Sequence, residues 1–481
     1  EAYLGVTAFV IFLRRLTSKN LTGCVVLMRY TLRLLTTQQF ERASTLICAC
    51  EKIRLENESL LGSERISIGL WIGRDSTPNT EEAAQNELTQ FLDKFQDYNN
   101  KFILLNCSWC NERLVPSERD STNIGYKIIN KKLKFVCPNN LCEFSIDSNC
   151  LPVCVVDESI YENPPSLLIG TIDKFASLPW SPEAISMLDS KEENSKPELI
   201  IQDELHLISG PLGSIAGMYE ILITALTEKK INNKIISAKI IGSTATISRA
   251  EHQIKNLYGK NCSIFPGQTN QLEDSFFAYE DQNEIGRKYV GIFCPSASSP
   301  QITLAKIMSS MLLGAADLRY LSDNKEEIFD PYWTNLLYFN SIRELMSGSS
   351  LITADVKGNI SGEYLRTGIT KSISGDLYKD RKRNINNIKE LTSREENSQI
   401  PKTLRSLDIS CANTKECIDL CLSTNMIQVG IDIPRLGLMT IVGQPKTTSE
   451  YIQASSRVGR AKDKPGLVLT MLSPFRPRDR S

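Results

Sequence analysis

One short stretch constrains this chain more than any other: the apolar run Leu199-Ile-Ile-Gln, which ends in Asp203-Glu204. A run of this length predicts a buried strand of a parallel sheet, with the two acids at the carboxyl edge where α/β sheets bind ligands. Adjacent carboxylates there can divide two tasks. Asp203 would hold a Mg²⁺ that bridges nucleotide phosphates, and Glu204 would orient or deprotonate an attacking water. The alternative is a strand end with two solvated acids. The motifs further along the chain distinguish between these two interpretations.

Two further motifs follow the acid pair along the chain. Gly242-Ser-Thr-Ala-Thr246 comes directly after the apolar run 235–241, which predicts another strand. Near the end of the chain, Gln453 is followed by Arg457 and Arg460. The spacing of three predicts that both guanidiniums lie on one helix face, from which they can reach a γ-phosphate across an interdomain cleft. Two surface arginines on a helix are the alternative. The order and spacing of all three motifs resemble the superfamily 2 helicases.

The resemblance implies roles for residues that match the family's motifs. In the Asp-Glu-x-His context, His206 is similar to the residue that couples the hydrolysis site to the Ser-Thr-Ala-Thr loop, and we expect coupling rather than proton transfer. A lone histidine satisfied by structural contacts is the alternative. The expected coupling residues on the loop are Ser243, Thr244 and Thr246.

The same resemblance extends to nucleotide contacts in the second half of the chain. The stretch 429–434, Val-Gly-Ile-Asp-Ile-Pro, resembles the helicase loop that touches both nucleotide ribose and nucleic acid. We therefore expect Gly430 and Asp432 to bind nucleotide. The expected catalytic set is Asp203, Glu204, Gln453, Arg457 and Arg460.

Polar side chains at the ends of expected strands form a candidate nucleic-acid surface. Guanidinium, ammonium, hydroxyl and amide groups suit contacts to phosphate and to a nucleic-acid strand. For the segment 29–40, an ordinary helix start with solvated arginines remains open. The basic stretch 379–389 reads as a solvated loop. The expected nucleic-acid contacts are Arg29, Arg33, Thr171, Lys174, Asn340, Ser341 and Arg394.

A second apolar run, 151–156, also ends in two acids and competes for the catalytic assignment. The order of motifs decides between the pairs. In the helicase pattern a unit like Gly170-Thr-Ile-Asp-Lys-Phe175 precedes the magnesium acids, and the Ser-Thr-Ala-Thr loop follows them. We therefore assign the chemistry to Asp203 and Glu204 and interpret Asp157-Glu158 as structural.

Cysteine spacing predicts a metal site in the first half of the chain. A CxxC pair is followed, after a polar loop, by a CxxxxC pair, and together they can supply the ligands of a tetrahedral zinc. Four thiolates leave no open position for a reactive water, so the expected role is structural. Small buried hydrophobes are the alternative, and Cys150 or Cys154 could replace a ligand. The expected ligands are Cys107, Cys110, Cys137 and Cys142.

Composition and periodicity indicate the class of protein in which these motifs occur. The chain has 481 residues, 41% hydrophobic and 23% charged, as in ordinary globular proteins. Its net charge of −1 argues against non-specific binding of nucleic acid through a large overall positive charge. Any affinity for nucleic acid must therefore come from a local cleft. Strand and helix patterns alternate, break at the cysteines, and restart near Tyr289 after a polar linker at 267–288.

The expected fold class is therefore α/β, and the resemblance implies two RecA-like P-loop NTPase domains in tandem. Residues 1–284 form the first domain, with a zinc-ribbon insertion at 106–150, and residues 285–481 form the second. No apolar stretch is long enough to span a membrane, and the opening apolar residues lack the features of a signal peptide. The 14 cysteines, unevenly spaced, indicate reduced thiols and a cytoplasmic location.

Longer stretches of the sequence resemble one subfamily, the helicase subunit of the DISARM phage-defence system. This resemblance covers nearly the whole chain. The stretches include Met28-Arg-Tyr-Thr-Leu-Arg, Gln202-Asp-Glu-Leu-His-Leu-Ile-Ser-Gly and Arg476-Pro-Arg-Asp. In that family a loop ending in Gly-Lys-Thr precedes the segment corresponding to Glu1, and this chain contains no GxxxxGK[ST]. That loop binds triphosphate through its backbone N–H groups and lysine. We therefore expect residues 1–481 alone to show no saturable ATPase activity.

The resemblance implies an ATP-dependent helicase or translocase that acts on nucleic acid, DNA rather than RNA, in antiviral defence. The implied cofactors are ATP, Mg²⁺ and a structural Zn²⁺, and the implied partners are other defence-system subunits. A DNA-binding scaffold that keeps the fold without turnover is one alternative, against which the intact acids and arginines argue. A zinc-dependent nuclease is another, but the chain has only 2 histidines and lacks the histidine-rich open site of such enzymes.

Overall fold

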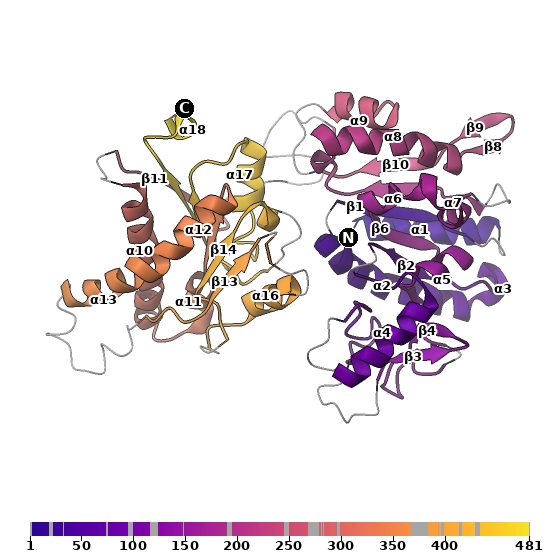
Figure 1. Ribbon diagram of the computed structural model, residues 1–481, viewed down its shortest axis with the longest axis horizontal. Coiled ribbons are helices and arrows are strands. Elements are labelled where there is room, and N and C mark those ends of the chain that lie inside the picture. The colour runs from indigo at the N-terminus through magenta and orange to yellow at the C-terminus, as the bar shows by residue number, and fades with distance from the viewer. Residues whose placement is uncertain are drawn as a thin grey trace. The chain divides into compact units, whose positions relative to one another are not determined.

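The chain folds into two compact units, Glu1–Ile264 and Phe265–Ser481, in the computed structural model (Figure 1). The sequence predicts a boundary between residues 284 and 285, inside the polar linker, whereas the two units divide between Ile264 and Phe265, just before that linker. The structure describes residues 2–18, 23–31, 33–73, 76–94, 100–115, 124–147, 149–189, 195–244, 250–267, 279, 281, 283–295, 299–366, 383–392, 394–395, 399–412, 416–428 and 433–480.

The first unit is built on a six-stranded sheet in which all pairings are parallel. Its four central strands are apolar runs buried along their whole length, as expected for strands covered on both faces. Because the strands run the same way, the residues that follow them emerge at one carboxyl edge. In spatial order the strands are β10 (Lys239–Gly242), β7 (Leu199–Gln202), β1 (Val26–Tyr30), β6 (Leu167–Thr171), β2 (Ile68–Trp71) and β5 (Val153–Cys154).

Helices pack around this sheet. They are α1 (Ala2–Thr17), α2 (Arg33–Glu56), α3 (Glu58–Leu61), α4 (Glu81–Lys94), α5 (Asp157–Glu162), α6 (Ile172–Phe175), α7 (Pro182–Leu188), α8 (Gly210–Thr227) and α9 (Ala250–Tyr258). A buried core joins strand and helix side chains, among them Leu27, Leu168 and Ile200 from the sheet and Ile223 from α8. The sheet edge is therefore a rigid platform for the loops that follow the strands.

Local sequence explains the start of α8 and the division of the strand expected at 235–241. α8 begins at Gly210, and Pro211 in its first turn needs no N–H partner. The strand expected at 235–241 is divided between two elements. Its first part pairs in a hairpin, β8 (Lys229–Ile231) with β9 (Lys234–Ile236), around Asn232 and Asn233, which both adopt positive φ. Its second part is β10.

The cysteine-rich insertion forms a small antiparallel hairpin, β3 (Tyr126–Ile129) with β4 (Lys132–Phe135), attached to the first unit. From α4, Glu81 accepts a hydrogen bond from the backbone N–H of Leu133 at 2.7 Å. From α2, Lys52 pairs with Glu143 and lies 5.3 Å from the centre of the Trp109 ring. The insertion thus packs on two helices of the unit that contains it.

The second unit has its own six-stranded sheet, again with all pairings parallel. Most of its strands are buried apolar runs, but all positions of β11 are exposed except Ile292, which is half-buried. In spatial order the strands are β11 (Lys288–Phe293), β16 (Leu467–Leu472), β15 (Leu438–Val442), β12 (Asn335–Phe339), β14 (Leu420–Ser423) and β13 (Ile388–Leu391).

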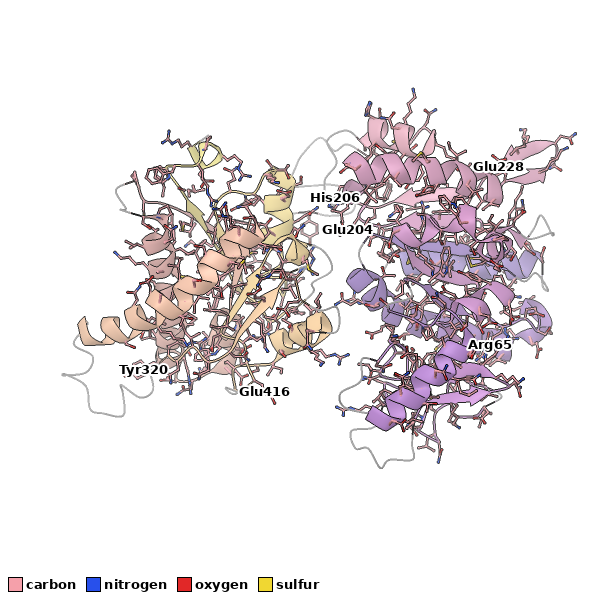
Figure 2. All side chains as sticks on the ribbon, viewed as in Figure 1. Arg65, Glu204, His206, Glu228, Tyr320 and Glu416 are labelled. Carbon is pink, nitrogen blue, oxygen red and sulfur yellow. The ribbon has the colours of Figure 1, made fainter. Side chains whose placement is uncertain are left out.

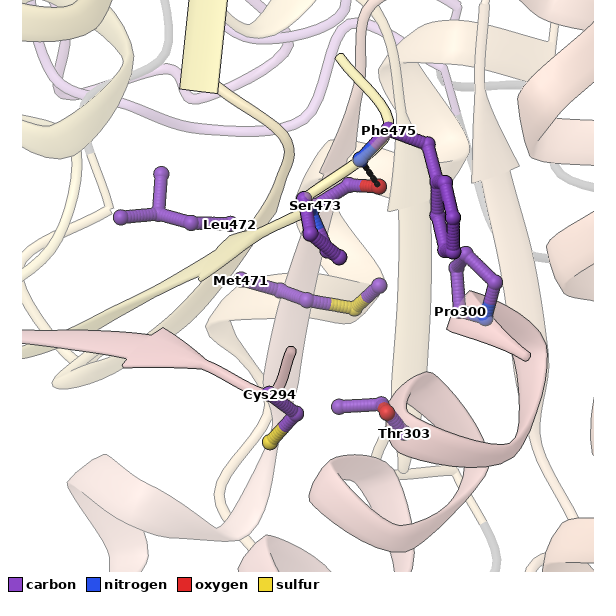
Figure 3. Close-up of a pocket in the computed structure, with 8 residues that line it drawn as sticks. Cys294, Pro300, Thr303, Met471, Leu472, Ser473 and Phe475 are labelled. Atoms are coloured by element: carbon purple, nitrogen blue, oxygen red, sulfur yellow. Dashed lines mark hydrogen bonds between the residues drawn. The ribbon is translucent and has the colours of Figure 1, made fainter. Parts of the chain in front are cut away.

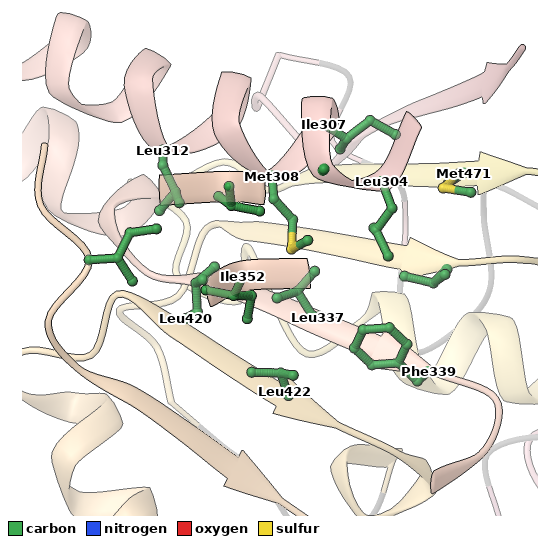
Figure 4. Packing of buried hydrophobic residues seen from close by; sticks show 14 of the residues in the cluster. Leu304, Ile307, Met308, Leu312, Leu337, Phe339, Ile352, Leu420, Leu422 and Met471 are labelled. Carbon is green, nitrogen blue, oxygen red and sulfur yellow. The ribbon is translucent and has the colours of Figure 1, made fainter. Parts of the chain in front are cut away.

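A long helix, α10, covers part of the second sheet. Figure 4 shows Met308 and Leu312 of α10 pointing toward Leu337 and Phe339 of β12, and all four side chains are at most 1% exposed. Gly348 of α12 is required by close packing, since an added Cβ would lie 2.5 Å from the Phe339 ring. The helices are α10 (Pro300–Leu321), α11 (Glu326–Trp333), α12 (Ile342–Leu351), α13 (Lys357–Arg366), α16 (Gln399–Asp408), α17 (Thr448–Ser455) and α18 (Pro477–Arg480). In the part of the chain that the structure describes, no helix is both long and apolar enough to cross a membrane.

Candidate functional site

The acid pair lies where the sequence predicted it, directly after β7. The neighbouring strand, β10, ends at Gly242, and backbone hydrogen bonds join the two exits. The Ser243 N–H donates to the Gln202 carbonyl at 2.9 Å, and the Leu205 N–H donates to the Ser243 carbonyl at 2.8 Å. The loop that contains Asp203 and Glu204 is thereby fixed beside the loop that contains Ser243.

The backbone of Glu204 is strained. Its φ of 49° and ψ of 45° lie in the left-handed region, which costs a non-glycine residue ~1–2 kcal/mol. The Asp203 carboxylate accepts the Glu204 N–H at 3.0 Å, and the Asp203 N–H donates to the Arg29 carbonyl at 3.1 Å. Such strain persists where neighbouring contacts impose it and is concentrated at functional sites. The geometry therefore favours a functional pair of acids over a merely solvated strand end.

His206 connects Glu204 to the neighbouring loop. Its Nδ1 lies 3.1 Å from the Thr244 hydroxyl and 3.4 Å from a Glu204 carboxylate oxygen. Figure 2 labels Glu204 and His206, which lie close together on the first unit. This is the contact that a coupling residue needs, since a shift of either loop changes the position of the imidazole. The fourth expected coupling residue, Thr246, lies outside the described residues.

Tyr3, in the first turn of α1, belongs to the same site and was missed by the sequence analysis. Its side chain lies near Ser243, Asp203 and Glu204. Burial raises the pKa of Tyr3, and the charges of the two acids raise it further. The phenol therefore stays protonated and can donate a hydrogen bond beside the acids. No local sequence signal marks this residue, because only the fold brings α1 to the end of β10.

The structure corrects the role expected for Arg29. Its side chain is 0% exposed and pairs with Glu220 of α8 at 2.6 Å, with Phe175 and Tyr258 nearby. β1 continues through Tyr30, so Arg29 lies inside the sheet rather than at the end of a strand. Arg29 is thus a buried structural cation and is not available to nucleic acid. The Arg33 side chain is not among those that the structure describes.

We predict that Glu220→Gln destabilises the first unit strongly, because it leaves the Arg29 guanidinium buried and uncompensated. Breaking a buried pair in this way costs roughly 3–5 kcal/mol, whereas apolar replacement of both partners is often neutral. The double variant Arg29→Met/Glu220→Leu should therefore recover most of the stability lost in the single variant. Urea unfolding followed by circular dichroism measures both. Equal midpoints for wild type and Glu220→Gln would contradict the prediction.

Thr171 and Lys174 also differ from the nucleic-acid role expected for them. Thr171 ends β6 and is 0% exposed. The Lys174 ammonium pairs with Asp157 at 2.6 Å and lies 5.6 Å from the centre of the Trp71 ring. Burial raises the pKa of Asp157, and the Lys174 charge opposes that rise. These contacts agree with the interpretation of Asp157 as structural and occupy Lys174 inside the unit.

In the second unit the arginine motif is not helical throughout. α17 ends at Ser455, so Arg457 and Arg460 lie in the turn that follows and not on one helix face as predicted. The turn is set by Gly459, which has a φ of 63° and whose added Cβ would lie 2.4 Å from the backbone nitrogen of Gly466. Arg460 is exposed and Arg457 partly so, whereas Gln453 is 6% exposed within α17. Spacing alone could not reveal this helix end.

The other expected contacts of the second unit lie at the carboxyl edge of its sheet. Asn340 follows β12 and donates to the carbonyls of Val442 and Gly443, both at 3.1 Å, which ties two strand exits together. Ser341 caps α12 by accepting the Glu344 N–H at 3.3 Å. Arg394 pairs with Glu390 at 2.7 Å. Gly430 and Asp432 lie outside the described residues.

The four predicted cysteines converge to form a thiol cluster. Their Sγ atoms all lie within 4.8 Å of one another, with 3.9 Å between Cys107 and Cys142 and 3.4 Å between Cys110 and Cys137. Sulfurs bound to a tetrahedral zinc at about 2.3 Å stand about 3.8 Å apart, so the cluster fits that ion. The Cys150 thiol instead lies 3.4 Å from the Arg65 guanidinium, outside the cluster.

The electrostatics of the cluster depend on its ligation state. Burial raises the pKa of the Cys107 thiol to about 11. Burial also acts to raise the pKa of Cys110, but hydrogen bonds with the Glu112 backbone and the neighbouring thiols lower it below its usual value. A bound cation would favour the thiolate form of all four. The cluster therefore has the closed composition of a structural metal site.

The chain is similar to known proteins in sequence. Residues 370–462 match the helicase conserved C-terminal domain. The chain is 37% identical over 529 aligned residues to the DISARM protein DrmA of Bacillus paralicheniformis, and the match covers 100% of this chain and 45% of the relative. The chain thus spans less than half the length of that relative.

The fold also has a solved counterpart. The helicase Lhr of Mycobacterium smegmatis, bound to single-stranded DNA and AMP-PNP, superposes with a TM-score of 0.50 at 13% identity, covering 97% of this chain and 42% of that one. An identity this low supports the fold only. It confirms the predicted α/β class, with two units similar to tandem RecA-like domains and a cysteine cluster inserted in the first.

Proposed function

We propose that this chain is a superfamily 2 helicase and forms the core of an ATP-dependent helicase or translocase that acts on DNA in antiviral defence. The relationship to a DISARM protein supports the defence context and partners from the same system. We further propose that it works in the cytoplasm. The observation that carries the proposal is the link from Glu204 through His206 to Thr244.

That link supports a specific division of labour. Asp203 is the residue that would hold Mg²⁺, which neutralises charge on the phosphates when it is bound with ATP. Glu204 orients or deprotonates the attacking water, and its strained backbone fixes the carboxylate in place. The Tyr3 hydroxyl supplies a donor beside both acids. Arg457 and Arg460 of the second unit stabilise the transferring phosphate, with Gln453 as a further contact.

Coupling distinguishes a motor from a simple ATPase. The imidazole of His206 contacts Glu204 of the acid loop and Thr244 of the neighbouring loop. A shift of the Glu204 side chain on hydrolysis therefore moves the Ser243–Thr244 loop through His206. Movement of that loop on DNA binding likewise shifts Glu204. We assign Ser341, Asn340 and Arg394 to the DNA-contacting edge of the second unit.

The test is the DNA dependence of ATP hydrolysis in a full-length gene product that includes a Gly-Lys-Thr loop, because residues 1–481 contain no GxxxxGK[ST]. Single-stranded DNA should stimulate the wild type, and His206→Ala should lose most of that stimulation while still binding ATP and DNA. The matched control is His252→Ala, whose imidazole lies exposed beside Asn256. ATP hydrolysis that no nucleic acid stimulates would refute the proposal. DNA binding without hydrolysis would identify a scaffold instead.

A further inference from the structure

We infer that the segment Phe475–Arg480, here called the terminal turn, is a second contact for single-stranded nucleic acid. This inference rests on the proposed function and adds residues that none of the sequence motifs assigned to DNA. The terminal turn follows β16 and includes α18. It therefore lies at the same carboxyl edge of the second sheet as Asn340.

The terminal turn is held rigidly by a buried carboxylate. Asp479 is 8% exposed, and its two oxygens accept the backbone N–H groups of Gln444 at 2.9 Å and Ser473 at 2.8 Å. These partners are the residues just after the exits of β15 and β16. These hydrogen bonds fix the backbone from which the Arg478 and Arg480 side chains extend. A fixed backbone lowers the conformational entropy that is lost on binding.

The charge exposed by the terminal turn is positive. Arg478 and Arg480 are exposed, and Lys446, in the loop after β15, is exposed at the same edge. Asp479 accepts two backbone N–H groups, Glu344 pairs with Arg476 at 2.7 Å, and the Arg480 Nε–H donates to the Pro474 carbonyl. Guanidinium groups are suited to phosphate oxygens. The edge therefore offers a local basic track on a chain whose net charge is −1.

An exposed aromatic ring begins the terminal turn. Phe475 is 68% exposed, and its backbone N–H donates to the Ser473 hydroxyl at 3.3 Å. Figure 3 shows the ring beside Pro300, in a pocket that Cys294, Thr303 and Met471 also line. A largely exposed aromatic ring in a segment that also has two exposed arginines is the combination used to stack bases of a single strand. Bases in a duplex are already stacked and paired, which favours a single-stranded ligand.

The test is equilibrium binding of the 481-residue chain to a fluorescein-labelled oligothymidylate, measured by anisotropy over a range of salt concentrations. Each phosphate contact to a single strand contributes about 0.7 to the salt slope, so Arg478→Ala/Arg480→Ala should make the slope shallower by about 1.4. Phe475→Ala should weaken binding roughly 5- to 150-fold without changing the slope, since it removes stacking but no charge. Arg478→Lys/Arg480→Lys should keep the wild-type slope.

The matched control is Lys402→Ala/Arg405→Ala, which removes the same charge from exposed positions on α16. It should leave the slope nearly unchanged, and thermal melts should show that all variants are folded. Wild-type slope and affinity in both the arginine and the phenylalanine variants would overturn the inference while leaving the proposed function intact. A wild-type chain that binds neither DNA nor RNA would instead overturn the proposed function, and the inference with it.

Discussion

Glu204→Gln is expected to slow ATP hydrolysis by about 100-fold or more while leaving ATP binding nearly intact. The amide preserves the shape of the side chain but cannot accept a proton from the attacking water. Because the backbone strain at Glu204 is imposed by neighbouring contacts, the substituted side chain should keep its position. Steady-state hydrolysis and nucleotide binding in a full-length gene product with a Gly-Lys-Thr loop measure the two effects separately.

The control for this substitution is Glu158→Gln, in the acid pair that competes with Asp203-Glu204. Glu158 is exposed at the start of α5, where one carboxylate oxygen accepts the Glu81 N–H at 2.8 Å. An amide oxygen can accept the same bond, so hydrolysis should stay close to wild type. If Glu158→Gln abolished hydrolysis and Glu204→Gln did not, the catalytic acids would belong to the other loop.

Loss of zinc is expected to be the largest single effect on stability. We predict one zinc per chain, held by the four clustered thiols, and a loss of several kcal/mol of unfolding free energy in Cys107→Ser, because structural zinc sites contribute roughly 10–16 kcal/mol of binding free energy. The insertion has only a short hairpin around the cluster and packs on α2 and α4. Metal analysis and thermal unfolding, with and without chelator, measure the effect.

Matched cysteine substitutions separate the zinc ligands from the other thiols. Cys150→Ser and Cys262→Ser lie outside the cluster and should retain zinc and nearly wild-type melting behaviour. Since the site is closed, Cys107→Ser should lower stability more than it lowers the specific activity of the protein that remains folded. Protein purified without chelators and found to contain no zinc would contradict the assignment.

Features that depend on local pattern could be predicted from the amino-acid sequence. Apolar runs such as Leu199–Gln202 and Leu438–Val442 became buried parallel strands, because no other element buries so short a run on both faces. The abrupt change from apolar to acidic residues after β7 placed Asp203 and Glu204 at the sheet edge. The paired spacing of the cysteines likewise predicted their convergence, since each pair needs only a tight turn.

Which polar groups are paired and which are exposed depends on long-range contacts, which local pattern does not predict. Arg29 and Lys174 have the composition of phosphate contacts, yet Glu220 and Asp157, far away in sequence, hold them inside the first unit. Tyr3 lies beside Asp203 and Glu204 because the fold brings α1 to the end of β10. A buried charge is stable only beside a compensating group, and the fold, which brings distant segments together, determines where that group lies.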